Sequence, residues 1–203
     1  MPRETRSGTV LRTAAALFAT KGFAAASVSQ LARRAGLSKP GIYYHIRDKE
    51  ELLFTICVNA MTGLLEVVRA AVAASDDPAV QLRGLMKAHT TYHWRHPDTL
   101  ATLFGQMGYL SPERRRPVVA LEREYLDLVR NIIREGQRRG VFRRVEPTVA
   151  AFSLFAMLNT IDGWYDPRGR IGRDDLVGEL ERVYLGGLVE RTRKRRPRAA
   201  APS

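Results

Sequence analysis

Apolar residues recur along this chain at the three- and four-residue spacing of amphipathic helices, and no stretch alternates long enough to predict a sheet. The stripe from Val10 to Phe18 ends at Lys21-Gly22, and Pro97 and Gly140 stand where later helices should end. Helices are predicted over about residues 10–21, 27–35, 39–46, 48–74, 78–96, 98–107, 113–139, 147–164 and 173–193. The expected fold class is all-α.

Two short helices near the N-terminus are joined as in a helix-turn-helix. The run Ser27-Val28-Ser29-Gln30 has the pattern of a capping box, and Ala35-Gly36-Leu37-Ser38 supplies a tight turn and a second cap. With Ile42 and Ile46 turned inward, the second helix presents an aromatic and basic face to solvent. Exposed tyrosine hydroxyls and rings suit phosphates, sugars and thymine methyl groups. An ordinary three-helix subdomain is the alternative.

The positive charge of the 203-residue chain is concentrated at its ends. The net charge is +12, yet residues 1–49 hold nine Lys or Arg against two acids, and residues 191–203 hold six Arg or Lys and no acid. The middle of the chain is close to neutral. A basic head on a neutral body indicates a polyanionic partner, most often nucleic acid.

Composition and motifs indicate the cellular compartment of the protein and whether it is an enzyme. No run of about 18 apolar residues and no secretory signal is evident, so a cytoplasmic protein without a membrane partner is expected. The single Cys57 excludes an internal disulfide and is interpreted as a small core residue. No nucleophile elbow, phosphate-binding loop or HExxH motif occurs, which argues against an enzyme, and no cofactor is expected.

The segment VLRTAAALFATKGFAAASVSQLARRAGLSKPGIYYHIRDKEELLF, residues 10–54, resembles the DNA-binding domain of the TetR family of bacterial transcriptional regulators. The resemblance implies a helix-turn-helix domain over residues 1–49 and an all-helical effector-binding and dimerisation domain over 50–193; residues 194–203 are expected to be a disordered basic tail. It implies a homodimer that binds a double-stranded operator and responds to a small molecule.

Carried over position by position, the resemblance implies contacts between the head and DNA. Groove contacts are expected from Ser29, Lys39, Pro40 and Tyr43, and phosphate contacts from Ser27, Tyr44, His45 and Lys49. Gly41 stands where the family usually has Thr, Ser or Ala, which removes a methyl or hydroxyl contact from the recognition helix. His45 has a second interpretation, as a residue that fixes the turn into the next helix.

The body is expected to hold an effector cavity and a dimer face. The cavity is assigned to side chains on apolar helix faces: Met61, Leu65, Leu85, His89, Leu103, Met107, Tyr125, Val129, Phe152, Phe155 and Asn159. The dimer face is assigned to the last two helices: Leu154, Leu158, Ile161, Leu180, Tyr184 and Leu188. An intramolecular core is the alternative for the second set, and a satisfied core amide is the alternative for Asn159.

The segment from Gly163 to Gly169 resembles TetR regulators common in actinobacteria, some of which respond to acyl-CoA thioesters. An acyl-CoA or a lipid- or steroid-derived ligand is therefore the expected effector of a repressor. The alternatives are an aromatic drug-like effector, with control of an efflux or catabolic gene, and a DNA-binding protein without effector. His89, His93 and His96 share one helix face and could bind a metal, but core or ligand-contacting roles are favoured.

Overall fold

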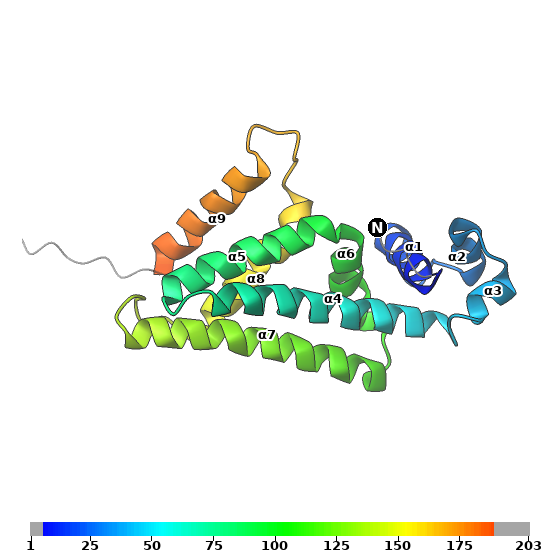
Figure 1. Cartoon of the computed structure of the whole chain (residues 1–203), viewed down its shortest axis with the longest axis horizontal. Helices are drawn as coiled ribbons and strands as arrows, with labels where there is room; N and C mark the ends of the chain where they lie inside the picture. Colours follow the sequence, from blue (N-terminus) through cyan, green and yellow to red (C-terminus); the bar gives the residue numbers. More distant parts are fainter. Residues whose placement is uncertain (1–5, 189–203) are drawn as a thin grey trace, which may run out of the picture.

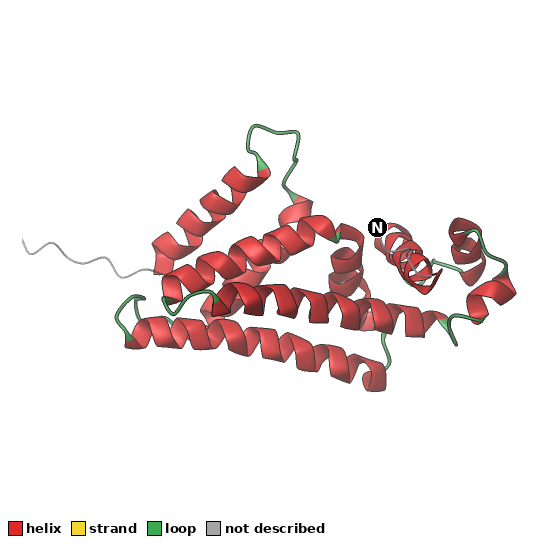
Figure 2. Ribbon diagram, viewed as in Figure 1, coloured by secondary structure: helices red, strands yellow, loops and turns green. Residues whose placement is uncertain are grey.

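The computed structural model describes residues 6–188, and this part of the chain is helical without any strand (Figures 1 and 2). The predicted all-α class is confirmed. Short 3-10 turns follow α6 at Met107–Tyr109 and α8 at Ile161–Gly163. The α-helices are α1 (Arg6–Lys21), α2 (Val28–Ala35), α3 (Lys39–Tyr43), α4 (Lys49–Ala73), α5 (Pro78–Arg95), α6 (Pro97–Gln106), α7 (Pro112–Arg138), α8 (Pro147–Asn159) and α9 (Arg173–Leu188).

Helices α1, α2 and α3 form a head at one end of the molecule (Figure 1). The predicted capping box is present: the Gln30 backbone N–H donates to Ser27 Oγ, and the Ser27 backbone N–H donates to Gln30 Oε1, both at 3.1 Å. Gly36 ends α2 with a φ of 67°, a left-handed conformation that suits glycine. Ser38 caps α3 through the Gly41 N–H. These local bonds fix the turn between the two helices.

Helix α3 ends at Tyr43 rather than at Ile46, which corrects the predicted length. The His45 N–H bonds the carbonyl of Ile42, three residues back, so the chain tightens before it turns into α4. Ile42 and Ile46 are nevertheless both buried, as their spacing predicted.

Helix α4 is the central helix of the body and packs against α5, α6, α7 and α1. By length and mean hydropathy alone, α4 could cross a membrane. Composition therefore does not support the expectation that the chain contains no membrane-spanning segment. Half of the residues in its most apolar stretch are buried inside the protein, and a core helix passes the same test. The central residue Cys57 is fully buried, and burial raises the pKa of its thiol to about 12. It packs as a small apolar residue.

Helix α8 ends at Asn159, whereas the apolar pattern predicted a helix through Trp164. The Thr160 hydroxyl donates to the Ala156 carbonyl, and the backbone leaves the α-helical region at Thr160 with φ −105° and ψ 7°. A loop then leads to α9 (Figure 2). The last predicted residues of α9 and the predicted disordered tail, 194–203, lie outside the described residues.

The head is held to the body by bonds from α6. Thr102 donates its hydroxyl to the Ala15 carbonyl of α1 at 3.0 Å, and this bond is buried. The Phe23 N–H, after α1, donates to Gln106 Oε1 at 2.7 Å. Because these bonds join residues more than 80 positions apart, they orient the head on the body directly.

The start of α7 also holds the head in place. Arg114 forms a bidentate ion pair with Asp48, the N-cap of α4, at 2.7 and 2.8 Å, and lies 3.3 Å from Glu50. The predicted domain boundary between residues 49 and 50 falls in this first turn of α4, which contacts both parts of the molecule.

Candidate functional site

The exposed surface of α2 and α3 carries most of the predicted DNA contacts. Tyr43 and Tyr44 are 47% and 88% exposed, which is unusual for tyrosines. The other exposed members of the predicted set are Ser27, Ser29, Lys39 and Pro40. Several polar and aromatic side chains therefore share one surface at the end of the molecule, as a groove-reading helix requires.

Three further residues of the predicted DNA-contact set are half-buried. Gly41 is half-buried, and its N–H is bonded to Ser38. His45 is half-buried beside α1 and packs edge-on against Tyr44, which fits its second interpretation as a residue that fixes the turn. Lys49 donates its ammonium to the carbonyls of Phe23 and Ala26 at 2.8 and 2.9 Å. Its phosphate contact stays a prediction, since its hydrogen bonds serve the loop before α2.

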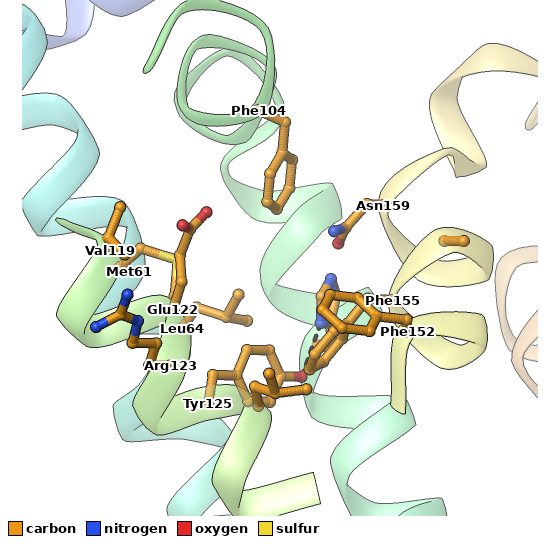
Figure 3. Close-up of a pocket in the computed structure, with 13 residues that line it drawn as sticks. Met61, Leu64, Phe104, Val119, Glu122, Arg123, Tyr125, Phe152, Phe155 and Asn159 are labelled. Atoms are coloured by element: carbon orange, nitrogen blue, oxygen red, sulfur yellow. Dashed lines mark hydrogen bonds between the residues drawn. The ribbon is translucent and has the colours of Figure 1, made fainter. Parts of the chain in front are cut away.

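The body contains an apolar cavity of about 680 Å³ between α4, α5, α6, α7 and α8 (Figure 3). A cavity of this size accommodates a drug-sized ligand. Six of the side chains predicted to line a cavity do so: Met61, His89, Tyr125, Phe152, Phe155 and Asn159. The structure therefore brings together residues from four helices that are distant in sequence.

The other five predicted lining residues do not reach this cavity, which corrects that part of the prediction. Leu85, Leu103 and Val129 are fully buried in the core, and Met107 is half-buried on the turn after α6. Leu65 instead borders a smaller cavity of about 340 Å³ between α4 and α7. An apolar helix face predicts burial, but whether the side chain meets another helix or an open space depends on how the helices pack.

Seven lining residues were missed: Leu64, Phe104, Val119, Glu122, Arg123, Leu126 and Ala156. Four of them lie on α7 around Tyr125, at the three- and four-residue spacing of one helix face. That spacing was available in the sequence, but Glu122 and Arg123 resemble solvent-facing charges there. Figure 3 shows the Glu122 side chain inside the cavity wall, with Phe104 and Asn159 on the opposite side.

Burial controls the electrostatics of the cavity. It lowers the pKa of His89 to about 3, so the imidazole is neutral. Tyr125 lies 2.9 Å from His89 Nδ1 through its hydroxyl, and burial raises the pKa of this phenol, so it keeps its proton. Burial also raises the pKa of Glu122. Burial therefore disfavours the ionised forms of His89, Tyr125 and Glu122.

His93 and His96 do not join His89 in a metal site. His93 Nε2 lies 2.5 Å from Asp162 Oδ2, and the His96 ring packs on Tyr92. Within residues 6–188 no group of three His, Cys, Asp or Glu side chains could hold a metal ion. The three histidines therefore do not form a set of metal ligands in the described part of the chain.

The predicted dimer residues lie inside the single chain, which corrects their assignment. Leu154, Leu158 and Ile161 are fully buried, and Leu180 and Leu188 are nearly so. Tyr184 is half-buried and donates its hydroxyl to the Ala150 carbonyl of α8 at 2.8 Å. Because these side chains pack between α8, α9 and the core, they offer almost no area to a second copy. They form the intramolecular core that was the alternative interpretation.

Three large apolar side chains on the same two helices are exposed instead. Val149 and Phe152 on α8 are 64% and 57% exposed, and Val183 on α9 is 70% exposed. Isolated exposed apolar residues are common, but three on the last two helices are candidates for an association surface.

A helix-turn-helix head joined to an all-helical body with a ligand-sized cavity defines a ligand-responsive DNA-binding regulator. The chain belongs to the TetR family: residues 10–56 match the model of bacterial regulatory proteins of the tetR family, and residues 75–188 match the tetracyclin repressor-like C-terminal domain. It is a TetR-family transcriptional regulator.

Three relatives illustrate the similarity. The transcriptional repressor KstR2 of Mycobacterium tuberculosis is 22% identical over 190 residues, which cover 91% of this chain and 94% of that protein. The transcriptional activator FasR of Mycolicibacterium smegmatis is 34% identical over 88 residues, 43% of this chain, and the match spans only 40% of FasR. The crystal structure of AibR in complex with isovaleryl coenzyme A and operator DNA is 28% identical with a TM-score of 0.83, covering 88% of this chain and 97% of AibR.

Proposed function

We propose that this protein is a homodimeric repressor that binds a palindromic operator and is released when a small, mainly apolar effector occupies the cavity. The observation that carries the proposal concerns α6. Phe104 on this helix lines the cavity. On the same helix, Thr102 bonds Ala15 of α1, and Gln106 bonds Phe23 in the loop that follows α1. A ligand that displaces Phe104 would move the helix that holds the head.

The proposed effector class is an acyl-CoA or another lipid- or steroid-derived molecule. The apolar lining supports it, and the similar regulator AibR is known in complex with isovaleryl coenzyme A and operator DNA. An aromatic drug-like effector is the second candidate, because Phe104, Tyr125, Phe152 and Phe155 surround the cavity with aromatic rings.

We place the dimer interface of this protein on the exposed patch of Val149, Phe152 and Val183. A dimer is needed because two recognition helices must reach major grooves about 34–36 Å apart. Sedimentation of the wild type and of Val183→Glu tests the patch: the variant should be monomeric at concentrations where the wild type is a dimer. A dimeric variant would place the interface elsewhere.

Fluorescence anisotropy on the DNA upstream of the protein's own gene tests the proposed function. The wild type should bind selectively at moderate salt, and isovaleryl-CoA, a long-chain acyl-CoA, a steroid or a flavonoid should weaken binding by about 5- to 150-fold, the usual range of allosteric coupling. Absence of selective binding would refute the DNA-binding function. Release by none of the four would favour an effector-independent DNA-binding protein.

A single substitution tests the role of α6. Thr102→Val removes the buried bond to Ala15 with little change in volume, so the effector should still bind while the release of DNA becomes weaker. Thr160→Val is the matched control, because the Thr160 hydroxyl bonds only within α8. Equal release in the wild type and in Thr102→Val would show that the head is moved by another route.

A further inference from the structure

Two buried polar atoms in the cavity wall lack partners. His89 Nε2 and Asn159 Oδ1 are both inaccessible to solvent, and neither has a hydrogen-bond partner among the described residues. Both side chains line the cavity, and Figure 3 shows Asn159 directed from α8 into it. An unpaired buried polar group destabilises the folded state, so two of them in a mainly apolar wall call for a physical cause.

The hydrogen-bond pattern at His89 fixes where its proton lies. The Tyr125 hydroxyl is protonated and buried, and His89 Nδ1 is the partner found for it in the described residues. If Nδ1 carried the proton, the phenol proton would have no acceptor. The favoured arrangement therefore has Tyr125 donating to Nδ1, which leaves the imidazole proton on Nε2. His89 therefore carries an N–H donor on Nε2, and it is one of the residues that line the cavity.

Asn159 supplies the complementary atom. Its amide lies close enough to the imidazole to raise the pKa of His89 against the larger lowering caused by burial, although no well-formed bond joins the two side chains. The cavity thus offers one donor, Nε2–H, and one acceptor, Oδ1, at neighbouring points. A hydroxyl group accepts one hydrogen bond and donates another, so a single hydroxyl can satisfy both atoms.

We propose that the ligand of this cavity carries a neutral hydroxyl group on an apolar body, and that His89 Nε2–H donates to this hydroxyl while Asn159 Oδ1 accepts from it. The proposal rests on the cavity being the effector site of the proposed function. A carbonyl or ether oxygen could use only His89 and would leave Asn159 unpaired. A carboxylate would gain no opposite charge at these two atoms, because His89 is neutral and Arg123, the cation among the lining residues, lies beside Glu122 on the side of the cavity opposite Asn159 (Figure 3).

Calorimetry without DNA tests the proposal with three probes that share one alkyl chain: decanol, decyl methyl ether and decanoate. One additional neutral hydrogen bond is worth about 0.5–1.5 kcal/mol, so the wild type should bind decanol about two- to twelvefold more tightly than the ether. Decanoate should bind most weakly. A sterol and its methyl ether form a second pair, which distinguishes a hydroxylated ring system from a hydroxylated chain.

Two variants locate the preference. Asn159→Leu removes the acceptor at similar volume, so the ratio of ether to alcohol dissociation constants should fall to about one. Met61→Leu is the matched control: it changes an apolar lining residue, so affinities can shift but the ratio should remain. The wild-type ratio tests the proposal even if Asn159→Leu does not fold.

A preference for the alcohol in either probe pair, lost in Asn159→Leu, supports the proposal. Equal affinity of alcohol and ether in both pairs overturns it, because water would then satisfy the two atoms equally well. No binding of any probe also overturns it. Operator binding is measured separately on the same samples. If the alcohol is not preferred but the operator is still bound, the hydroxyl proposal fails and the regulatory function stands; loss of operator binding would instead count against the regulatory function.

Discussion

Lys49 provides a sharp distinction between a DNA contact and a structural bond. The resemblance to TetR regulators implies that it binds a phosphate, whereas the structure directs its ammonium to the carbonyls of Phe23 and Ala26 and places it 4.3 Å from the centre of the Phe23 ring. Lys49→Met keeps the aliphatic stem and removes the charge. We expect it to destabilise the head and to leave the salt dependence of DNA binding unchanged.

The magnitude follows from the contacts that are lost. Hydrogen bonds to a charged group contribute about 1.5–3 kcal/mol each, and a cation–π contact about 0.5–1 kcal/mol at an exposed site. Lys49 is only half-buried, and water can replace part of this interaction at the two carbonyls. The expected loss in the free energy of unfolding is therefore about 2–3 kcal/mol, below the roughly 3.5–7 kcal/mol that the three contacts would give if they were fully shielded from water.

Two measurements separate the roles. Urea unfolding followed by circular dichroism gives the stability, and operator affinity at several salt concentrations gives the slope of log affinity against log salt. A lost phosphate contact lowers that slope by about 0.9, or about 1.8 for a dimer with two equivalent contacts. Lys39→Met is the matched control, since Lys39 is exposed on α3: its positive charge, in a groove lined by phosphates, should contribute to the slope without contributing to stability.

The result that would refute the structural role is equally specific. If Lys49→Met kept wild-type stability and lowered the slope as much as Lys39→Met, then Lys49 would leave its loop carbonyls to bind phosphate in the complex. Unchanged stability and an unchanged slope would contradict both interpretations.

Three further predictions concern the body and its junction with the head. Gly136→Ala should destabilise the protein by about 1–3 kcal/mol in urea unfolding, because a Cβ there would lie 2.0 Å from the Phe142 ring. Glu122→Gln should raise thermal stability at neutral pH; burial raises the pKa of Glu122, so its ionised form costs stability as pH rises through that pKa. Arg114 lowers the pKa of Asp48 to about 2, so this pair should stabilise the protein above about pH 4 and lose that effect as acid titration approaches pH 2, which Asp48→Asn should flatten.

Each of these has a contradicting result. A Gly136→Ala variant as stable as the wild type would mean that the Phe142 ring moves aside freely. Equal stability of Glu122→Gln and wild type at every pH would show that the carboxylate is fully hydrated. An acid-unfolding profile of Asp48→Asn that overlays the wild type would remove the pair with Arg114 as a contributor, as its partial exposure to solvent could allow.

The local elements of the head could be predicted because their determinants lie close together in sequence. Ser27 caps a helix by bonding Gln30, and Ser38 caps the next by bonding Gly41, each three residues away. Gly36 adopts the left-handed turn that few other residues tolerate. Such patterns are visible in the sequence because both partners are present in a window of a few residues.

The same reasoning failed where a helix is apolar on two faces. Helix α8 carries Leu154 and Leu158 on one side and Val149 and Phe152 on another, and periodicity does not tell which side packs inside the chain. The structure turns the leucines inward and leaves the other pair exposed. The dimer residues were therefore misplaced, although the helix itself was correctly expected.

The sequence by itself determined the helices, their caps, the basic character of the head and the family to which the chain belongs. Only the tertiary structure decided that Lys49 bonds carbonyls more than 20 residues away, and that His89 meets Tyr125 across 36 residues. The physical reason is the range of the interactions. Caps and amphipathic stripes are fixed within one or two helical turns, whereas a cavity and its unpaired polar atoms exist only after distant helices have packed together.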